Sequence, residues 1–463
     1  MGIDSTLVSE HPFALDGKGG TARLVVRHHR LPNGLELLLV RDPIAPIFAY
    51  QTWFRVGSRH ERDGITGIAH LFEHLMFNQT ESHPPGEFDR LIEMAGGDTN
   101  AATWADWTYY RDNLPASELR LAVELESDRM AHLVLGDKQV ESEREVVANE
   151  RRFRVEDDVD GFLSEEMFRI AFTVHPYHWP TIGWMRDIQA ITIDDCRQFY
   201  RTYYAPNNAT VVLVGDFDEA AALDLIGQHY GKIPSSQIPP DRAPAEPEQT
   251  AERRAVYRKP VMSDKLRMAW KAPPVTDPDH VRLEVLSEIL FGGNSSRLQR
   301  KLVSDGEIAA SVSAAATPFR DVGLYEIGLS LQRGKASAEA EAVIVEELER
   351  LKREPPSMEE LVVAQTRLET RFVRDLRPSG GKAEGLGHFH TTFGDYRALF
   401  RLYDGYRSVT ADEISAVAAR VFDDRRRTVI IAEPDPDAAP DELDDDEDTV
   451  VDGLTGDEPT EVA

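Results

Sequence analysis

The sequence of 463 residues contains one cysteine, Cys196. A single thiol excludes an internal disulfide and a cysteine-based zinc site, so histidines and carboxylates would have to hold any metal ion. No uninterrupted apolar run approaches the roughly 18 residues of a membrane-spanning helix, and the start shows no basic segment followed by an apolar core. We therefore expect a chain that is neither exported nor bound to a membrane, with a cytoplasmic location.

Positive charge is also scarce. The 52 lysines and arginines face 81 aspartates and glutamates, which gives a formal net charge of −29. A field of this sign repels phosphate backbones and anionic lipids, so we expect no nucleic-acid partner and no membrane partner. Between Glu433 and Ala463 there are 14 acidic residues and no lysine or arginine. Such a segment repels itself, and we expect it to form a disordered tail.

The two halves of the chain resemble each other. Five prolines lie in the polar stretch 232–254, which is typical of an extended linker. A shift of 218 residues places 192–195 on 410–413, and both copies continue through a helical stretch into an apolar strand. In both copies Thr, followed three residues later by Asp or Glu, predicts the start of a helix. We predict an α+β fold of two similar α/β-roll domains related by internal duplication, each an antiparallel-rich sheet packed with helices.

Strand signals in the first half lead into a helix. Asn33-Gly34, within 30–37, indicates a hairpin turn, and 48–56 is rich in aromatic and β-branched residues. Apolar residues then recur at the spacing of an amphipathic helix: Ile68, Leu71, Phe72, Leu75 and Met76.

His70 and His74 are four residues apart on this helix, so both imidazoles project from one side and can bind one ion. Glu73 completes the pattern H-x-x-E-H, in which the carboxylate can reach a metal-bound water without being a ligand. A catalytic zinc ion usually takes three protein ligands. A third ligand is therefore expected from another rigid element.

The predicted helix 139–155 carries two candidate ligands, Glu143 and Glu150. Seven residues of helix separate their carboxylates by about 10 Å, too far for both to bind one ion. We assign Glu150 to the metal and Glu143 to a supporting position, where it accepts the far N–H of a ligating imidazole. Without the histidine pair, both would be interpreted as solvated charges on a surface helix.

These residues resemble the motif of the M16 metallopeptidases, the inverted zincins, and within them the mitochondrial-processing-peptidase-like subunits. That family has a distal glutamate after a spacer similar to the 75 residues between His74 and Glu150. The stretch 96–103 resembles the family's substrate-binding edge strand, and 175–183 resembles a stretch downstream of the distal glutamate. The resemblance covers approximately residues 25 to 432.

The resemblance implies a mechanism and a set of site residues. One zinc ion per chain would be held by His70, His74 and Glu150, with Glu73 as general base. A peptide or unfolded protein segment would bind as an added strand along four residues, Asn100, Ala101, Ala102 and Thr103. Phe77 either lines the pocket for the residue after the cut or is an ordinary core aromatic.

The second half lacks the ligands. A shift of 214 residues places Glu284, Ser287 and Glu288 at the positions of the motif, so the second domain should bind no zinc. The family's Arg and Tyr that hold the substrate fall on Val303 and Ala310, which cannot donate such hydrogen bonds. The resemblance therefore implies a second, different M16-like subunit that supplies the Arg and Tyr, and we favour a heterodimer over a homodimer.

We thus predict a zinc-dependent endopeptidase that hydrolyses peptides or unfolded segments in a chamber formed by paired subunits. Two alternatives stay open: a non-catalytic core or assembly subunit of the same fold, and a homodimeric processing peptidase. The expected segments are an N-terminal extension (1–24), a catalytic domain (25–232), a linker (233–254), a non-catalytic domain (255–433) and the acidic tail (434–463).

One further pair of histidines receives a structural interpretation. His388 and His390 could chelate from one strand face, but without a third ligand nearby a structural role is favoured.

Overall fold

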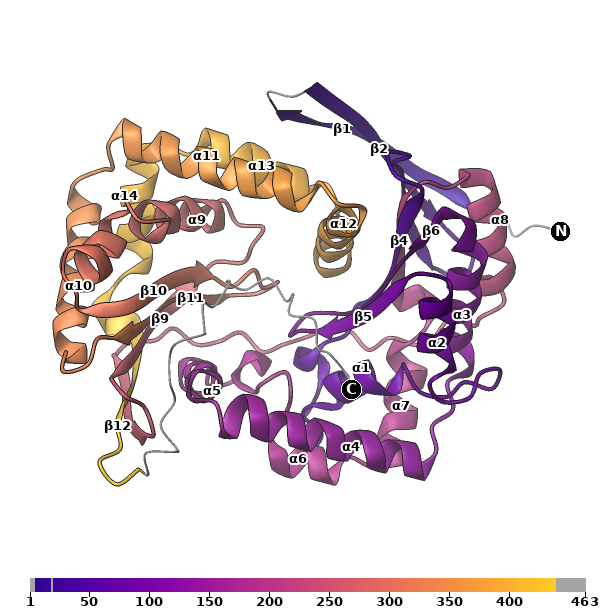
Figure 1. The fold of residues 1–463 in the computed structure, drawn as a ribbon, viewed down its shortest axis with the longest axis horizontal. Helices are drawn as coiled ribbons and strands as arrows, with labels where there is room; N and C mark the ends of the chain where they lie inside the picture. The colour runs from indigo at the N-terminus through magenta and orange to yellow at the C-terminus, as the bar shows by residue number, and fades with distance from the viewer. Residues whose placement is uncertain (1–4, 18–19, 439–463) are drawn as a thin grey trace. The chain divides into compact units, whose positions relative to one another are not determined.

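The computed structural model describes residues 5–17 and 20–438. The chain forms two compact units, coloured along the sequence in Figure 1. Unit 1 comprises Met1–Arg151, Trp179–Ala243 and Arg371–Phe400, and unit 2 comprises Arg152–His178, Pro244–Thr370 and Arg401–Ala463. The contiguous domain boundaries given above remain a prediction, and the predicted acidic tail lies outside the described residues from 439 onward.

Unit 1 is built on a seven-stranded sheet with the order β1-β2-β3-β7-β4-β6-β5. Its strands are β1 Thr6–Gly17, β2 Gly20–Arg30, β3 Glu36–Arg41, β4 Ile47–Phe54, β5 Asp98–Thr103, β6 Thr108–Pro115 and β7 Ala209–Gly215. Only β3 and β7 pair in parallel; the other neighbours are antiparallel. The predicted turn at Asn33-Gly34 joins β2 to β3, and Gly34 has a φ of 92°, a backbone conformation that glycine adopts without strain.

Helices cover both faces of this sheet. They are α1 Ile68–Leu75, α2 Glu87–Met94, α3 Leu119–His132, α4 Asp137–Arg151, α6 Met185–Ala190, α7 Ile193–Tyr203, α8 Glu219–Tyr230 and α12 Ser379–Phe393, with short turns η1 Ser58–His60, η2 Ala116–Glu118 and η5 Pro206–Asn208. Alternate strand residues meet the apolar stripe of α1 in one core, which includes Leu37, Leu39, Tyr50, Phe54, Leu71, Phe72 and Leu75. The predicted amphipathic helix after Ile68 is thus present.

Helix α12 comes from late in the sequence and packs on the opposite face, against β4 and β7 (Figure 1). A Cβ added at Gly387 would lie 2.2 Å from the indole nitrogen of Trp53, so the helix approaches that ring closely. Lys382 forms a buried ion pair with Asp42 at 2.9 Å. The prediction that His388 and His390 lie on a strand is therefore wrong: both belong to α12.

Unit 2 has a five-stranded sheet with the order β10-β11-β9-β12-β8. Its strands are β8 Arg253–Lys259, β9 Lys265–Ala272, β10 Ala309–Ala316, β11 Gly323–Leu331 and β12 Arg427–Pro434. The remaining helices are α5 Val159–Ala171, α9 Pro278–Phe291, α10 Ser337–Arg353, α11 Met358–Asp375, α13 Ala398–Ser408 and α14 Ala411–Val421, with short segments η3 Arg152–Glu156, η4 Pro176–His178, η6 Gln299–Ser304 and η7 Asp424–Arg426. None of the helices in the described part of the chain has both the length and the apolar character needed to cross a membrane.

The two sheets repeat one topology. The order β10-β11-β9-β12-β8 matches β5-β6-β4-β7-β3 strand for strand, and β8 pairs with β12 in parallel just as β3 pairs with β7. Both predicted capping boxes form, with Thr192 accepting from the backbone of Asp195 and Thr410 from that of Glu413. The predicted α+β fold of two similar halves is confirmed.

Candidate metal centre

A buried carboxylate fixes the start of α1. Glu61 accepts hydrogen bonds from the backbone N–H groups of Gly67 and Ala69, each at 2.8 Å. Gly67 has a φ of 90°, and a Cβ there would lie 2.4 Å from the carbonyl oxygen of Ile182. Only glycine fits this close approach, and α1 is thereby held against the 182–183 backbone. Sequence reasoning missed Glu61 because it precedes the helix by more residues than a capping box spans.

Helices α1 and α4 bring the three predicted metal ligands together. The Nε2 of His74 lies 3.3 Å from the Oε2 of Glu150, and the Nε2 of His70 lies 3.6 Å from the same oxygen. One ligand atom from each residue lies within 4.8 Å of the others. The two imidazole rings meet nearly at right angles, with centroids 5.0 Å apart. These atoms converge on a volume that one ion can occupy.

The predicted supporting glutamate lies on the far side of His74. The Oε2 of Glu143 is 3.7 Å from the Nδ1 of His74, the ring nitrogen that does not face Glu150. Asn78 donates a hydrogen bond of 2.9 Å to the other oxygen of Glu143 and so orients its carboxylate. An oriented acceptor at Nδ1 favours the tautomer whose Nε2 lone pair faces the ligand site. Asn78 was not singled out from the sequence, because a neutral amide at a helix end carries no distinctive signal.

Negative charge surrounds the two imidazoles. Burial alone would lower the pKa of His74, but the carboxylates of Glu150, Glu73 and Glu143 bring that pKa above its ordinary value. The same field attracts a cation. Two imidazole nitrogens and a carboxylate oxygen are a donor set that suits Zn²⁺, with a further position left for water. The residues present therefore fit the implied metal ion.

The predicted substrate strand lies at the margin of the sheet. β5 pairs only with β6 among the described strands, and it packs beside α1. The predicted contact residues, Asn100 to Thr103, are half-buried on this strand. Glu73 is also half-buried, on α1.

Phe77 follows α1 and packs against the core. Its ring centroid lies 5.9 Å from that of Phe88 and 6.0 Å from that of Tyr110, and the guanidinium of Arg129 lies 5.3 Å from its centre. These contacts are those of the core aromatic considered above. A role for Phe77 in a substrate pocket stays a prediction.

The positions in α9 that match the motif are used for packing contacts within unit 2. Glu284 accepts from the hydroxyl of Tyr406 at 3.1 Å, Ser287 bonds Tyr325 at 2.8 Å, and Arg367 pairs with Glu288 at 2.7 Å. Among the residues that the structure describes, unit 2 holds no group of three possible metal ligands. Val303 lies in η6 and Ala310 in β10.

Known proteins resemble this chain in sequence. The family model described as "Insulinase (Peptidase family M16)" matches residues 37–183, and the "Peptidase M16 inactive domain" matches residues 190–368. The zinc protease PqqE of Helicobacter pylori is 31% identical over 411 residues, which cover 87% of this chain and 92% of that protein. An uncharacterised zinc protease of Mycobacterium leprae is 26% identical over 403 residues, covering 87% of this chain and 90% of that protein.

Solved structures show the same architecture. The crystal structure of a protease from Helicobacter pylori has a TM-score of 0.84 at 30% identity, covering 88% of this chain and 99% of that one. A putative M16-like peptidase from Alicyclobacillus acidocaldarius has a TM-score of 0.79 at 22% identity, covering 89% of this chain and 99% of that one. At that lower identity the likeness concerns the fold alone.

Proposed function

The chain belongs to peptidase family M16, and from this premise we propose that it is a zinc-dependent endopeptidase acting on peptides or unfolded protein segments. The observation that carries the proposal is the convergence of His70, His74 and Glu150 within 4.8 Å. Relatives that are named zinc proteases support it.

The residues of α1 and α4 have three different roles: metal binding, proton transfer and orientation of a ligand. His70, His74 and Glu150 would hold one catalytic zinc ion, and the bound ion would supply the Lewis acidity that activates water at neutral pH. Glu73 takes a proton onto its carboxylate oxygen as general base and passes it to the leaving amine. The Oε2 of Glu143, 3.7 Å from the Nδ1 of His74, favours the coordinating tautomer of that ring.

The substrate binds as an extra strand on β5. The edge of the sheet offers backbone N–H and C=O groups next to α1, and such pairing tolerates many sequences because it uses the main chain. A peptide must be extended to pair in this way. The enzyme therefore selects unfolded segments over folded domains.

We further propose a partner subunit of the mitochondrial-processing-peptidase-like type. Val303 and Ala310 cannot donate hydrogen bonds from their side chains to a substrate or an oxyanion. A second, different M16-like chain that carries an Arg and a Tyr would supply them. The active species is then a heterodimer, to which this chain contributes the zinc-binding half.

The test combines metal analysis with cleavage of internally quenched peptides, using this chain alone and together with its co-purifying partner. Glu73→Gln should retain zinc but lower kcat by at least about 10²-fold, because only proton transfer is lost. Glu150→Gln should lose both zinc and activity. Glu145→Gln is the matched control, since it changes an exposed glutamate on the same helix and should leave both unchanged.

Each part of the proposal can fail separately. Undiminished cleavage by Glu73→Gln would remove that residue from the reaction. Cleavage by the isolated chain at low concentration would contradict the heterodimer and favour the homodimeric alternative. A zinc-loaded complex that cleaves no peptide would favour a non-catalytic assembly subunit.

A further inference from the structure

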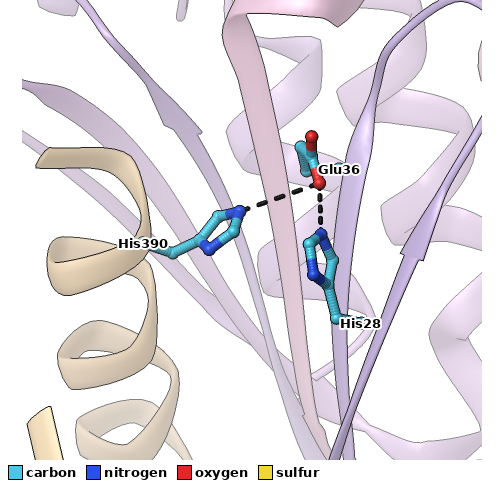
Figure 2. A group of neighbouring side chains, drawn as sticks. All are labelled: His28, Glu36 and His390. Atoms are coloured by element: carbon cyan, nitrogen blue, oxygen red, sulfur yellow. Dashed lines mark hydrogen bonds and ion pairs between the residues drawn. The ribbon is translucent and has the colours of Figure 1, made fainter. Parts of the chain in front are cut away.

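Unit 1 contains a second group of converging histidine and carboxylate side chains, on elements other than α1 and α4. Figure 2 shows His28 on β2, Glu36 on β3 and His390 on α12, with both imidazoles pointing at one carboxylate. His28 and Glu36 come from the hairpin closed by Asn33-Gly34, where Glu36 is the diagonal neighbour of His28 across the strand pair. His390 reaches them from a helix encoded much later in the chain.

The spacing of the ligand atoms suits a single ion. The Oε2 of Glu36 directly contacts the Nε2 of His28 and lies 3.8 Å from the Nε2 of His390. One atom from each residue lies within 4.8 Å of the others, as in the group formed by His70, His74 and Glu150. Ligand atoms of a tetrahedral zinc ion lie about 3.3 Å apart, given zinc–ligand bonds of about 2.0–2.1 Å. Small side-chain movements therefore suffice to enclose an ion.

His390 provides a second, independent observation. Its side chain belongs to a residue that is only 4% exposed, and neither ring nitrogen has a hydrogen-bond partner among the described residues. A buried polar atom without a partner costs free energy. An ion bound at Nε2 satisfies the nitrogen that faces Glu36.

One carboxylate oxygen of Glu36, Oε2, faces both imidazoles. Arg30 donates from Nε to its Oε1 at 2.7 Å, which leaves Oε2 to His28 and His390.

We propose that His28, Glu36 and His390 form a second site for a divalent transition-metal ion, best suited to Zn²⁺, in addition to the peptidase site. Imidazole and carboxylate ligands are those that zinc prefers when no thiolate is present. The three residues are 8%, 5% and 4% exposed, so a peptide does not reach them. The ion fastens α12 to the β2–β3 hairpin, and its role is structural. This inference does not depend on peptidase activity.

The test is zinc stoichiometry by mass spectrometry of the metal after removal of excess zinc, using the full chain. The wild type should hold two equivalents. A His70→Gln/His74→Gln double variant, which lacks the peptidase site, should hold one. Adding His390→Gln to that double variant should reduce the content to none. His29→Gln is the matched control: His29 neighbours His28 on β2 but lies by Glu219, at 3.6 Å, and its loss should remove no ion.

A thermal measurement keeps the test decisive if His390→Gln folds poorly. Zinc in excess should raise the Tm of the His70→Gln/His74→Gln variant by about 2–5 °C, because the ion binds only the folded chain. Zinc content below about half an equivalent in that variant, with no zinc-dependent rise in Tm, would overturn the proposal. Failure of the peptidase proposal alone would leave this variant's single equivalent in place.

Discussion

At the scale of single residues, Glu61 links a backbone turn to the metal ligands. Its carboxylate accepts from the N–H groups of Gly67 and Ala69 at the start of the helix that carries His70 and His74. Replacing Glu61 should therefore loosen both histidines, although it changes neither of them.

Glu61→Ala should therefore weaken both the fold and zinc binding. Two buried N–H groups lose their acceptor, which costs about 1–3 kcal/mol for an unsatisfied group, and the shortened side chain leaves a cavity. Chemical denaturation and a competitive zinc titration measure the two effects. The exposed Glu145→Ala on α4 is the control. An unchanged zinc affinity in a destabilised Glu61→Ala protein would show that the cap serves the fold alone.

Lys271 should make the stability of unit 2 depend on pH. Its Nζ lies 2.9 Å from the ring centre of Phe172 and has no hydrogen-bond partner among the described residues. Burial lowers the pKa of Lys271 to about 7, with Glu246 opposing the shift. Between this value and the ordinary pKa of about 10.4, the unfolded chain binds one more proton than the folded chain, so stability rises with pH across that window.

Lys271→Met removes this dependence. The variant should be more stable than the wild type by on the order of a few kcal/mol below pH 7, and the difference should shrink as the pH rises from about 7 to about 10. Urea denaturation at several pH values measures it, with the exposed Lys138→Met as control. A difference that stays constant over this range would show that Lys271 does not titrate in the folded protein.

The candidate metal centre could be read from the sequence only where local spacing encodes it. The spacing of His70, Glu73 and His74 places these three side chains on one helix face. The third ligand, Glu150, was supported by the resemblance of its spacing from His74 to that of a known family. Asn78 acts through a hydrogen bond to Glu143, which lies on another helix, and Glu61 caps its helix from outside the span of a capping box. The group of His28, Glu36 and His390 was missed because its third ligand arrives on α12.

At the scale of elements, the duplication could be predicted from the sequence because both copies have a capping box and an apolar strand at a constant offset. The matching strand orders of the two sheets agree with that reading. The position of α12 could not be predicted from the sequence. Its residues follow most of unit 2 in the sequence, yet it packs on β4 and β7 of unit 1. The periodicity of a helix shows which of its faces is apolar, but not which sheet that face contacts.

Gly387→Ala should test how tightly α12 packs. Alanine favours a helix over glycine by about 1 kcal/mol, but the new methyl group would lie 2.2 Å from the Trp53 nitrogen. Trp53 is stacked on Tyr109 at 4.2 Å and cannot readily move. We expect a net loss of about 1–3 kcal/mol in the free energy of unfolding, measured by denaturant titration.

Gly380→Ala on the same helix is the matched control for this change. Its nearest neighbour would be 3.7 Å away, an ordinary contact, so this variant should be neutral or slightly more stable. Equal effects at the two positions would contradict the close contact between α12 and the sheet.

At the scale of the whole molecule, the net charge of −29 bears on substrate choice. If the proposed function holds, basic peptides should associate faster than neutral ones of equal length. Raising the ionic strength from about 0.01 M to about 0.1 M shortens the screening length from about 30 Å to about 10 Å. The value of kcat/KM for a basic peptide should then fall by about tenfold, while that for a neutral peptide stays the same. A flat response for both peptides would count against electrostatic selection.

The last strand of the sheet in unit 1 ends at Gly215, but α12, which packs on one face of that sheet, begins only at Ser379. During translation, the strands are therefore complete before the helix that covers this face has been synthesised. At about 5–20 residues per second, the chain between Ala243 and Phe393 takes roughly 8–30 s to emerge. Throughout this interval the face of the sheet that carries Trp53 lacks the helix that packs on it. Nascent chains would need a chaperone over this aromatic surface, and an N-terminal fragment ending at Ala243 should aggregate when produced alone.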